Sequence, residues 1–254
     1  MSILAYCVSL LAGGRTRLQV QGVCALVLRL GISDVLYNMS ADLAKGVFKP
    51  MVPERIKETG PGAECPYSVN SFYRFIARSR INKAIPYVSG RLLDAGCGIG
   101  TMMDYLPEGA EYVGFDDDPR PIAYLRKKNP EAKIFCLDIQ KDSLAEEGPF
   151  DTVTCLAVVE HVEDPRGFLR RCVDLLRPGG TLVVTSPTKL GEFVRGVICA
   201  LHLVTPGATE PGETHDANYS LSELSNLVKH SGCEVVAAKH FQLGINQIVV
   251  GRKS

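Results

Sequence analysis

Four residues at strict alternation stand out chemically: Asp94, Gly96, Gly98 and Gly100, in the segment "LLDAGCGIG". Glycine has no Cβ, so these positions permit a tight turn with positive φ and let a ligand reach the backbone. Asp94 ends the preceding apolar run and would aim a carboxylate into the cleft. A dinucleotide-binding turn would have its third glycine, or an alanine, at residue 101, where this chain has Thr101. The spacing therefore disfavours an NAD-dependent oxidoreductase.

A second carboxylate, Asp116, ends the segment "EYVGFD", about twenty residues after the glycine turn, the separation typical of an acid that binds ribose hydroxyls. A third, Asp138, ends "AKIFCLD". Each acid alone is more typical of a solvated strand end or a helix cap. In open α/β sheets, ligands bind at the carboxyl ends of the strands. Acids at the ends of successive strand-like segments therefore predict a nucleoside-binding cleft.

Seven segments have the composition of β-strands, and helical segments alternate with them. The strand candidates are 91–96, 111–116, 132–138, 150–159, 181–187, 233–241 and 245–253. Five βα alternations followed by two terminal strands predict an α/β fold with a doubly wound, seven-stranded, mostly parallel sheet. A leading helix is expected within residues 69–88.

Helix-capping residues support this register. In "VEDPRGFLRRCVDLLRPGG", Asp164 caps a helix whose first turn holds Pro165 and which the glycine pair 179–180 ends. Ser220 and Glu223 have the spacing of a capping box for the last helix, which precedes the two closing strands.

Composition narrows the function classes. The 28 basic and 28 acidic residues balance, so no overall field attracts nucleic acid, and none is expected as a partner. The nine cysteines are scattered without CxxC pairs, which favours reduced thiols in a cytoplasmic protein over disulfides or a zinc site. The sequence does not indicate an oligomeric state.

Residues 1–66 are expected to form an apolar helical extension, separated from the main domain, 67–254, by a loop rich in proline and glycine. The first apolar run, "SILAYCVSLLAGG", is too short to span a bilayer. Helices packed on the main domain are favoured over helices lying on a membrane through residues 1–30.

A family resemblance emerges from the ordered segments "LLDAGCGIG", "VGFDDDP", "CLD", "FDTVTCLAVVEHVEDP" and "LRPGGTLVVTSP". Together they resemble the class I S-adenosylmethionine-dependent methyltransferases, with their Rossmann-like fold. The resemblance implies S-adenosylmethionine as cofactor. It places the glycine turn around the methionine part and ribose, Asp116 at the ribose hydroxyls, Asp138 and Ile139 at the adenine, and the backbone near Cys155 at the methionine amino group. The implied cofactor-binding set is Asp94, Gly96, Cys97, Gly98, Gly100, Asp116, Asp117, Asp138, Ile139 and Cys155.

Methyl transfer from a sulfonium is an in-line displacement that needs positioning and exclusion of water. An oxygen acceptor of high pKa also needs a general base. His161, just past the fourth strand, is the best-placed candidate for this catalytic role, with Glu160 beside it. The alternative is that both residues orient the loop or the cofactor.

Residues 188–219 form a long insertion that is expected to act as an acceptor lid. Its apolar segment is similar to the insertion of the ubiquinone-biosynthesis O-methyltransferases. Those enzymes tend to carry a carboxylate where this chain has Ala157, which speaks against a metal-assisted mechanism. A helix covering the cleft is favoured over a membrane contact through 190–204. His202, His215 and Asp216 lack helical ligand spacing, so no metal site is expected.

The leading hypothesis is a methyltransferase that acts on a small or lipid-like acceptor at oxygen, in the cytoplasm or associated with a membrane. Nitrogen or carbon methylation on the same scaffold is one alternative. The other is a non-catalytic subunit that binds S-adenosylmethionine, because a fold does not by itself determine a function.

Overall fold

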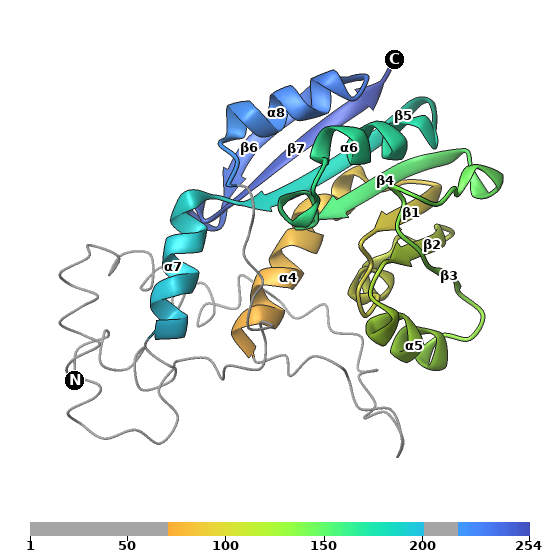
Figure 1. The fold of residues 1–254 in the computed structure, drawn as a ribbon, viewed down its shortest axis with the longest axis horizontal. Coiled ribbons are helices and arrows are strands. Elements are labelled where there is room, and N and C mark those ends of the chain that lie inside the picture. The colour runs from red at the N-terminus through yellow and green to blue at the C-terminus, as the bar shows by residue number, and fades with distance from the viewer. Residues whose placement is uncertain (1–70, 201–217) are drawn as a thin grey trace. The chain divides into compact units, whose positions relative to one another are not determined.

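The computed structural model describes residues 71–200 and 218–254, with side chains described for 76–195 and 218–254. Within these ranges one sheet of seven strands runs in the order β3-β2-β1-β4-β5-β7-β6 (Figure 1). The strands are β1 Arg91–Ala95, β2 Glu111–Asp116, β3 Lys133–Cys136, β4 Phe150–Leu156, β5 Leu176–Pro187, β6 Cys233–Phe241 and β7 Asn246–Lys253. Strands β1 to β5 pair in parallel, and β7 runs antiparallel to both of its neighbours. The predicted doubly wound, mostly parallel sheet is confirmed.

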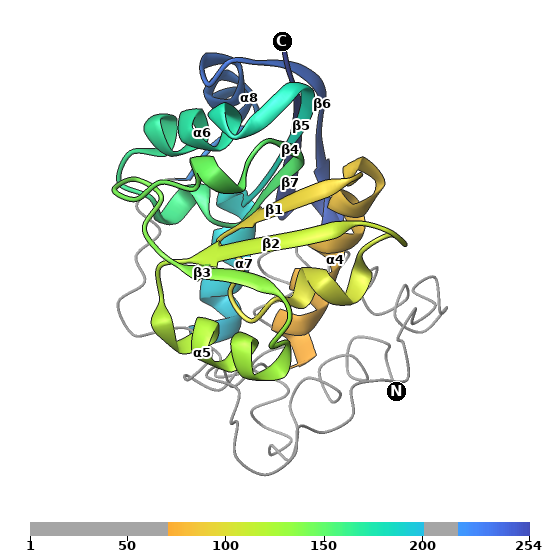
Figure 2. The same cartoon turned by 90° about the vertical axis from the view of Figure 1, so that its right-hand side faces the viewer.

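Helices cover both faces of this sheet (Figure 2). The α-helices of the described ranges are α4 Ser71–Ala84, α5 Pro119–Lys128, α6 Pro165–Asp174, α7 Lys189–Ala200 and α8 Leu221–His230. Helices α6 and α8 pack on one face and α4 and α5 on the other, each over a cluster of buried apolar side chains. Because strand side chains alternate, Leu92 lies in the cluster under α4 and Leu93 in the cluster under α6 and α8.

The prediction of an α-helix after each of the first five strands is wrong at two places. The glycine turn is followed by a short 3-10 helix, η2 Thr101–Tyr105, and β3 is followed by another, η3 Ala145–Glu147. In each case a proline, Pro107 or Pro149, stands two residues beyond the short helix. The residue before a proline is disfavoured in the α conformation, so neither turn extends into an α-helix.

The predicted start of α6 is confirmed and its predicted end is wrong. Asp164 accepts a hydrogen bond from the backbone N–H of Gly167 at 2.9 Å, and the helix begins at Pro165. It ends at Asp174 rather than at the glycine pair 179–180, because Leu176 already pairs with Phe150 in the sheet.

The predicted capping box of α8 is present. The Ser220 Oγ accepts from the backbone N–H of Glu223, and the Glu223 carboxylate accepts from the backbone N–H of Ser220. This cap begins the helix directly after the undescribed segment, so it places α8 against the sheet as expected.

By contacts, the described residues 71–194 and 218–254 belong to one compact unit. The predicted extension 1–66, most of the lid 188–219, and His202, His215 and Asp216 lie outside the described residues. Among the helices that the structure describes, none is long and apolar enough to cross a membrane.

Candidate cofactor and methyl-transfer site

A cleft of about 600 Å³ opens at the carboxyl ends of β1 to β4, where a doubly wound sheet binds its ligands. Its lining comprises Gly96, Phe115, Asp116, Asp117, Asp118, Leu137, Asp138, Ile139, Gln140, Lys141, Ala157, Val158, His161, Val162, Glu163 and Phe168. The structure therefore brings together six of the residues that the sequence nominated, from Gly96 to His161. Of the apolar lining, Ile139 was predicted and the rest was not, although Phe115 and Leu137 directly precede nominated acids.

The glycine turn has the predicted left-handed backbone. Gly96 has a φ of 72° and Gly98 a φ of 50°. The backbone N–H groups of Gly96 and Cys97 both donate to the carbonyl of Phe115 at 2.9 Å, which fixes the turn against β2. A Cβ on Gly98 would meet nothing within 4 Å, so this position is open to a ligand, as the sequence predicted.

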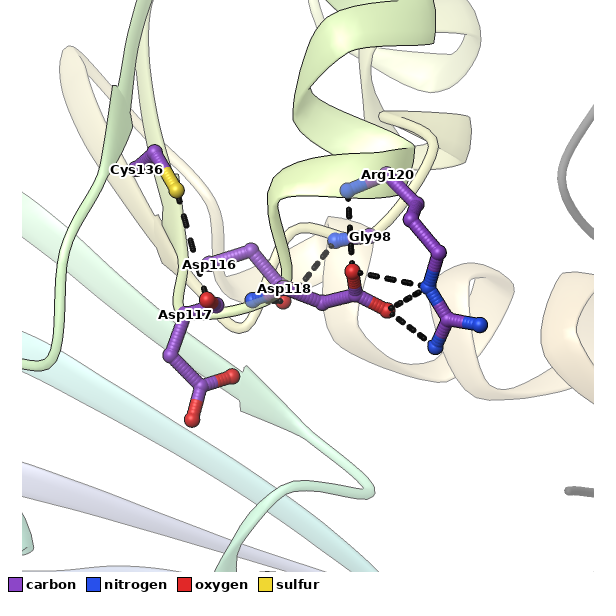
Figure 3. A network of polar contacts seen from close by, with 6 residues as sticks. All are labelled: Gly98, Asp116, Asp117, Asp118, Arg120 and Cys136. Carbon is purple, nitrogen blue, oxygen red and sulfur yellow. Dashed lines mark hydrogen bonds and ion pairs between the residues drawn. The ribbon is translucent and has the colours of Figure 1, made fainter.

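Asp116 is held by the same turn (Figure 3). Its Oδ2 accepts from the backbone N–H of Gly98 at 2.8 Å, and its Oδ1 accepts from the backbone N–H of Asp118 at 3.0 Å. Burial raises the pKa of Asp116, and the two backbone hydrogen bonds oppose that rise. Each carboxylate oxygen accepts one hydrogen bond and keeps further lone-pair capacity, so two adjacent hydroxyls could each donate to Asp116. The residues present thus fit the ribose of S-adenosylmethionine.

The two acids that follow differ from Asp116. The Asp118 carboxylate pairs with the Arg120 guanidinium at 2.8 Å, and the pKa of Asp118 is lowered by the hydrogen bond from Arg120. Figure 3 shows the Asp117 carboxylate turned away from that pair. Asp117 lines the cleft, so its predicted contact with the cofactor stays a prediction.

Asp138 and Ile139 lie beyond the end of β3. Asp138 accepts from the backbone N–H of Gln140 at 2.9 Å and pairs with Lys141 at 2.8 Å, and this hydrogen bond from Lys141 lowers the pKa of Asp138. Ile139 is buried, and its carbonyl accepts from Arg171 at 3.0 Å. Both residues line the cleft, where the resemblance would place the adenine.

Asp94 lies behind the turn rather than on the cleft lining. Its carboxylate accepts from Tyr112 Oη at 3.0 Å and from Thr154 Oγ1 at 2.8 Å. Burial raises the pKa of Asp94 to about 6, although both hydrogen bonds oppose the rise. These partners were missed because the register that sets Thr154 beside Asp94 is a property of the folded sheet.

The side chains of Cys97 and Cys155 also lie off the cleft lining. Cys155 is fully buried, with its Sγ 4.0 Å from the Sγ of Cys172, and burial raises the pKa of the Cys97 thiol. Neither residue lines the cleft, so their predicted contact with the cofactor stays a prediction.

Glu160 and His161, adjacent in the short helix η4 Val159–His161, occupy different environments. His161 is exposed and lines the cleft. Glu160 is 1% exposed, and neither of its carboxyl oxygens has a hydrogen-bond partner in the structure as described. Burial raises the pKa of Glu160 to about 7, with the Arg80 guanidinium opposing. The sequence nominated both residues for the same site. In the structure, His161 lies on the cleft and Glu160 is buried away from its lining.

Gly96→Ala is expected to lower stability and to weaken cofactor binding. The left-handed φ alone costs an alanine roughly 1–2 kcal/mol, and the new Cβ would lie 2.4 Å from Val158 Cγ2, pushing that side chain into the cleft. Urea unfolding and calorimetric titration with S-adenosylhomocysteine measure both effects. The double variant Gly96→Ala/Val158→Ala should recover the stability and affinity that are lost through the overlap with Val158. It should not recover the stability that is lost through the left-handed φ. Full additivity of the two changes would show that the overlap has no role.

With this geometry in hand, the comparisons with known proteins identify the family. Residues 70–238 match the family model described as a methyltransferase domain. The chain belongs to this family. The match spans the glycine turn, Asp116 and the η4 helix of the cleft, so the predicted class I S-adenosylmethionine-dependent methyltransferase is confirmed.

The methyltransferase domain has relatives of known name. It is 32% identical over 160 residues to the ubiquinone biosynthesis O-methyltransferase of Xylella fastidiosa (strain 9a5c), a match that covers 60% of this chain and 64% of that protein. The chain thus spans slightly less than two thirds of this curated relative.

Solved structures share the fold of the methyltransferase domain. Magnesium protoporphyrin IX methyltransferase from Synechocystis PCC 6803, with bound SAH, superposes with a TM-score of 0.54 at 19% identity, covering 73% of this chain and 89% of that chain. The N-methyltransferase NodS from Bradyrhizobium japonicum WM9 has a TM-score of 0.53 at 17% identity, with the same coverages of 73% and 89%. At these identities the likeness concerns the fold.

Proposed function

We propose that this methyltransferase transfers the methyl group of S-adenosylmethionine to a hydroxyl oxygen of a small-molecule acceptor. The observation that carries the donor side is the Asp116 carboxylate, fixed by two backbone N–H groups beside the open Gly98 position. The oxygen acceptor is supported by the relative that is named an O-methyltransferase.

The residues of the cleft have separate tasks in this proposal. When bound, the cofactor supplies an electrophilic methyl group on a sulfonium sulfur. Asp116 holds the ribose hydroxyls, Asp138 and Ile139 border the adenine, and the buried Phe168 helps to exclude water from the cleft. Ala157, which has a φ of 60° at the end of β4, leaves room beside the cleft because its side chain is a single methyl group.

Methyl transfer to a panel of matched phenols and anilines, with methyl-labelled S-adenosylmethionine, tests the proposal. We use phenol, 1,2-dihydroxybenzene and 2-methoxyphenol, each beside the aniline of the same shape. Label is expected in an aryl methyl ether. Label in the anilines alone would indicate N-methylation, and cofactor binding without any transfer would indicate a non-catalytic subunit; either result would reject the proposal.

His161→Ala is expected to lower turnover far more than cofactor affinity. His161 lines the cleft at its exposed rim, where an imidazole can reach a bound acceptor. Turnover with the phenol panel and titration with S-adenosylhomocysteine separate the two quantities. Equal turnover in the variant and the wild type would remove His161 from the reaction.

A lipid-like acceptor met at a membrane stays a prediction. Within residues 190–204, through which this contact was predicted, Phe193 is 50% exposed and Leu190 is 40% exposed. The side chains of Val197, Ile198 and Leu201 lie outside the described residues.

A further inference from the structure

A group of buried and half-buried polar side chains lies beyond the cofactor cleft, on the α4 side of the sheet. We call Arg80, Glu160, Thr185, Gln242 and Asn246 the Arg80 cluster. Arg80 Nε donates to Asn246 Oδ1 at 3.0 Å, and Asn246 Nδ2 donates to Gln242 Oε1 at 2.6 Å. The cluster therefore joins α4 to the start of β7.

Glu160 and Thr185 complete the cluster from η4 and β5. Burial lowers the pKa of Arg80. The negative charges of Glu160 and, to a smaller extent, Glu192 oppose this lowering. Thr185 alternates with Val183, which packs in the apolar cluster under α4, so Thr185 faces the same side as Arg80. The backbone N–H of Ala157 donates to the carbonyl of Thr185 at 3.0 Å, which ties β5 to the segment that leads to Glu160.

Four buried polar atoms of this cluster lack a hydrogen-bond partner in the structure as described. They are Glu160 Oε1, Glu160 Oε2, Thr185 Oγ1 and Gln242 Nε2. Native proteins leave few buried polar atoms unpaired, and each such atom calls for an explanation. The four unpaired atoms lie at the carboxyl edge of the sheet. Because ligands of this fold bind at that edge, a polar group of a ligand is expected there.

The unpaired atoms define the chemistry of that group. Glu160 can accept a hydrogen bond or a proton, Gln242 Nε2 can only donate, and the Thr185 hydroxyl can do both. A hydroxyl satisfies this set because it donates and accepts at once. A protonated amine cannot accept from Gln242, and it would be repelled by Arg80.

Resting on the proposed function, we infer that the Arg80 cluster binds the acceptor hydroxyl and that Glu160 takes its proton. The O–H bond breaks, with the proton moving to Glu160. An oxygen lone pair forms the new bond to the methyl carbon, the sulfur–carbon bond breaks, and its electron pair stays on sulfur. Arg80 then faces a neutral carboxylic acid, and the proton leaves to solvent after the ether departs.

Binding of the phenol panel to the S-adenosylhomocysteine complex of the full chain tests this site without turnover. Glu160→Gln keeps the side-chain shape but cannot take a proton, and Glu131→Gln, on an exposed residue of the loop before β3, is the matched control. We expect Glu160→Gln to weaken phenol binding at least tenfold. We expect it to lower kcat about a hundredfold or more, the usual share of a general base. Its affinity for S-adenosylhomocysteine should stay that of the wild type.

Thr185→Val provides a second variant that should fold, because it removes a buried hydroxyl that has no partner in the structure. It should unfold at the temperature of the wild type or above, yet bind phenols more weakly. A merely structural cluster would leave phenol affinity unchanged in this variant.

The outcomes separate the two proposals. Phenol binding that depends on Glu160 and Thr185, without label transfer, would reject O-methylation and retain the binding site. Label transfer to phenols that is insensitive to both substitutions would retain O-methylation and overturn the site. Absence of phenol binding, or an equal loss of S-adenosylhomocysteine affinity, would also overturn it.

Discussion

Asp116→Ala is expected to weaken the binding of S-adenosylmethionine and S-adenosylhomocysteine by about a hundredfold or more. Two hydrogen bonds from ribose hydroxyls to a carboxylate contribute roughly 1.5–3 kcal/mol each. The substitution removes both acceptors and also frees the backbone N–H groups of Gly98 and Asp118, which the carboxylate now holds. Calorimetric titration with each ligand measures the loss directly.

Two further variants show whether the loss comes from the ribose contact. Asp116→Asn keeps the shape and one carbonyl oxygen, so its affinity should lie between those of the wild type and Asp116→Ala. Asp174→Ala, on an exposed acid at the end of α6, should bind as the wild type does. If Asp116→Ala kept wild-type affinity for both ligands, the cofactor would not bind through this carboxylate.

The unfolding free energy of the wild type, relative to Glu160→Gln, is expected to fall by about 2–3 kcal/mol between pH 5 and pH 8. Burial raises the pKa of Glu160 from 4.5 to about 7 in the folded protein. Between these values the folded chain keeps a proton that the unfolded chain releases. The stabilisation is therefore fully present below pH 4.5 and is lost as the pH rises through 7.

Urea unfolding of both proteins at several pH values measures this difference. Asp94, whose pKa of about 6 also lies in this range, titrates equally in the two proteins and cancels. The exposed control Glu131→Gln should follow the wild type at every pH. Parallel curves for the wild type and Glu160→Gln would mean that Glu160 is ionised in the folded protein at both pH values. The pair with Arg80 would then outweigh the burial of Glu160.

Much of the cofactor side could be predicted because its residues are close in sequence. The positive φ of Gly96 and Gly98, the acid at the end of β2 and the capping box of α8 each follow from a few neighbouring residues. Helix ends were less predictable. Leu176 continues the apolar spacing of α6, but its pairing with Phe150 places it in β5, and that choice depends on a strand elsewhere in the chain.

The sequence by itself determined the class of sheet, the glycine turn and the acid beside it, because local backbone preferences and strand composition set them. The tertiary structure alone decided the surroundings of Glu160. Arg80 and Asn246 are separated by 166 residues, and they meet because β7 inserts beside β5 and α4 packs over it. Strand order and the direction of each buried side chain depend on packing among distant elements, and no local pattern records them.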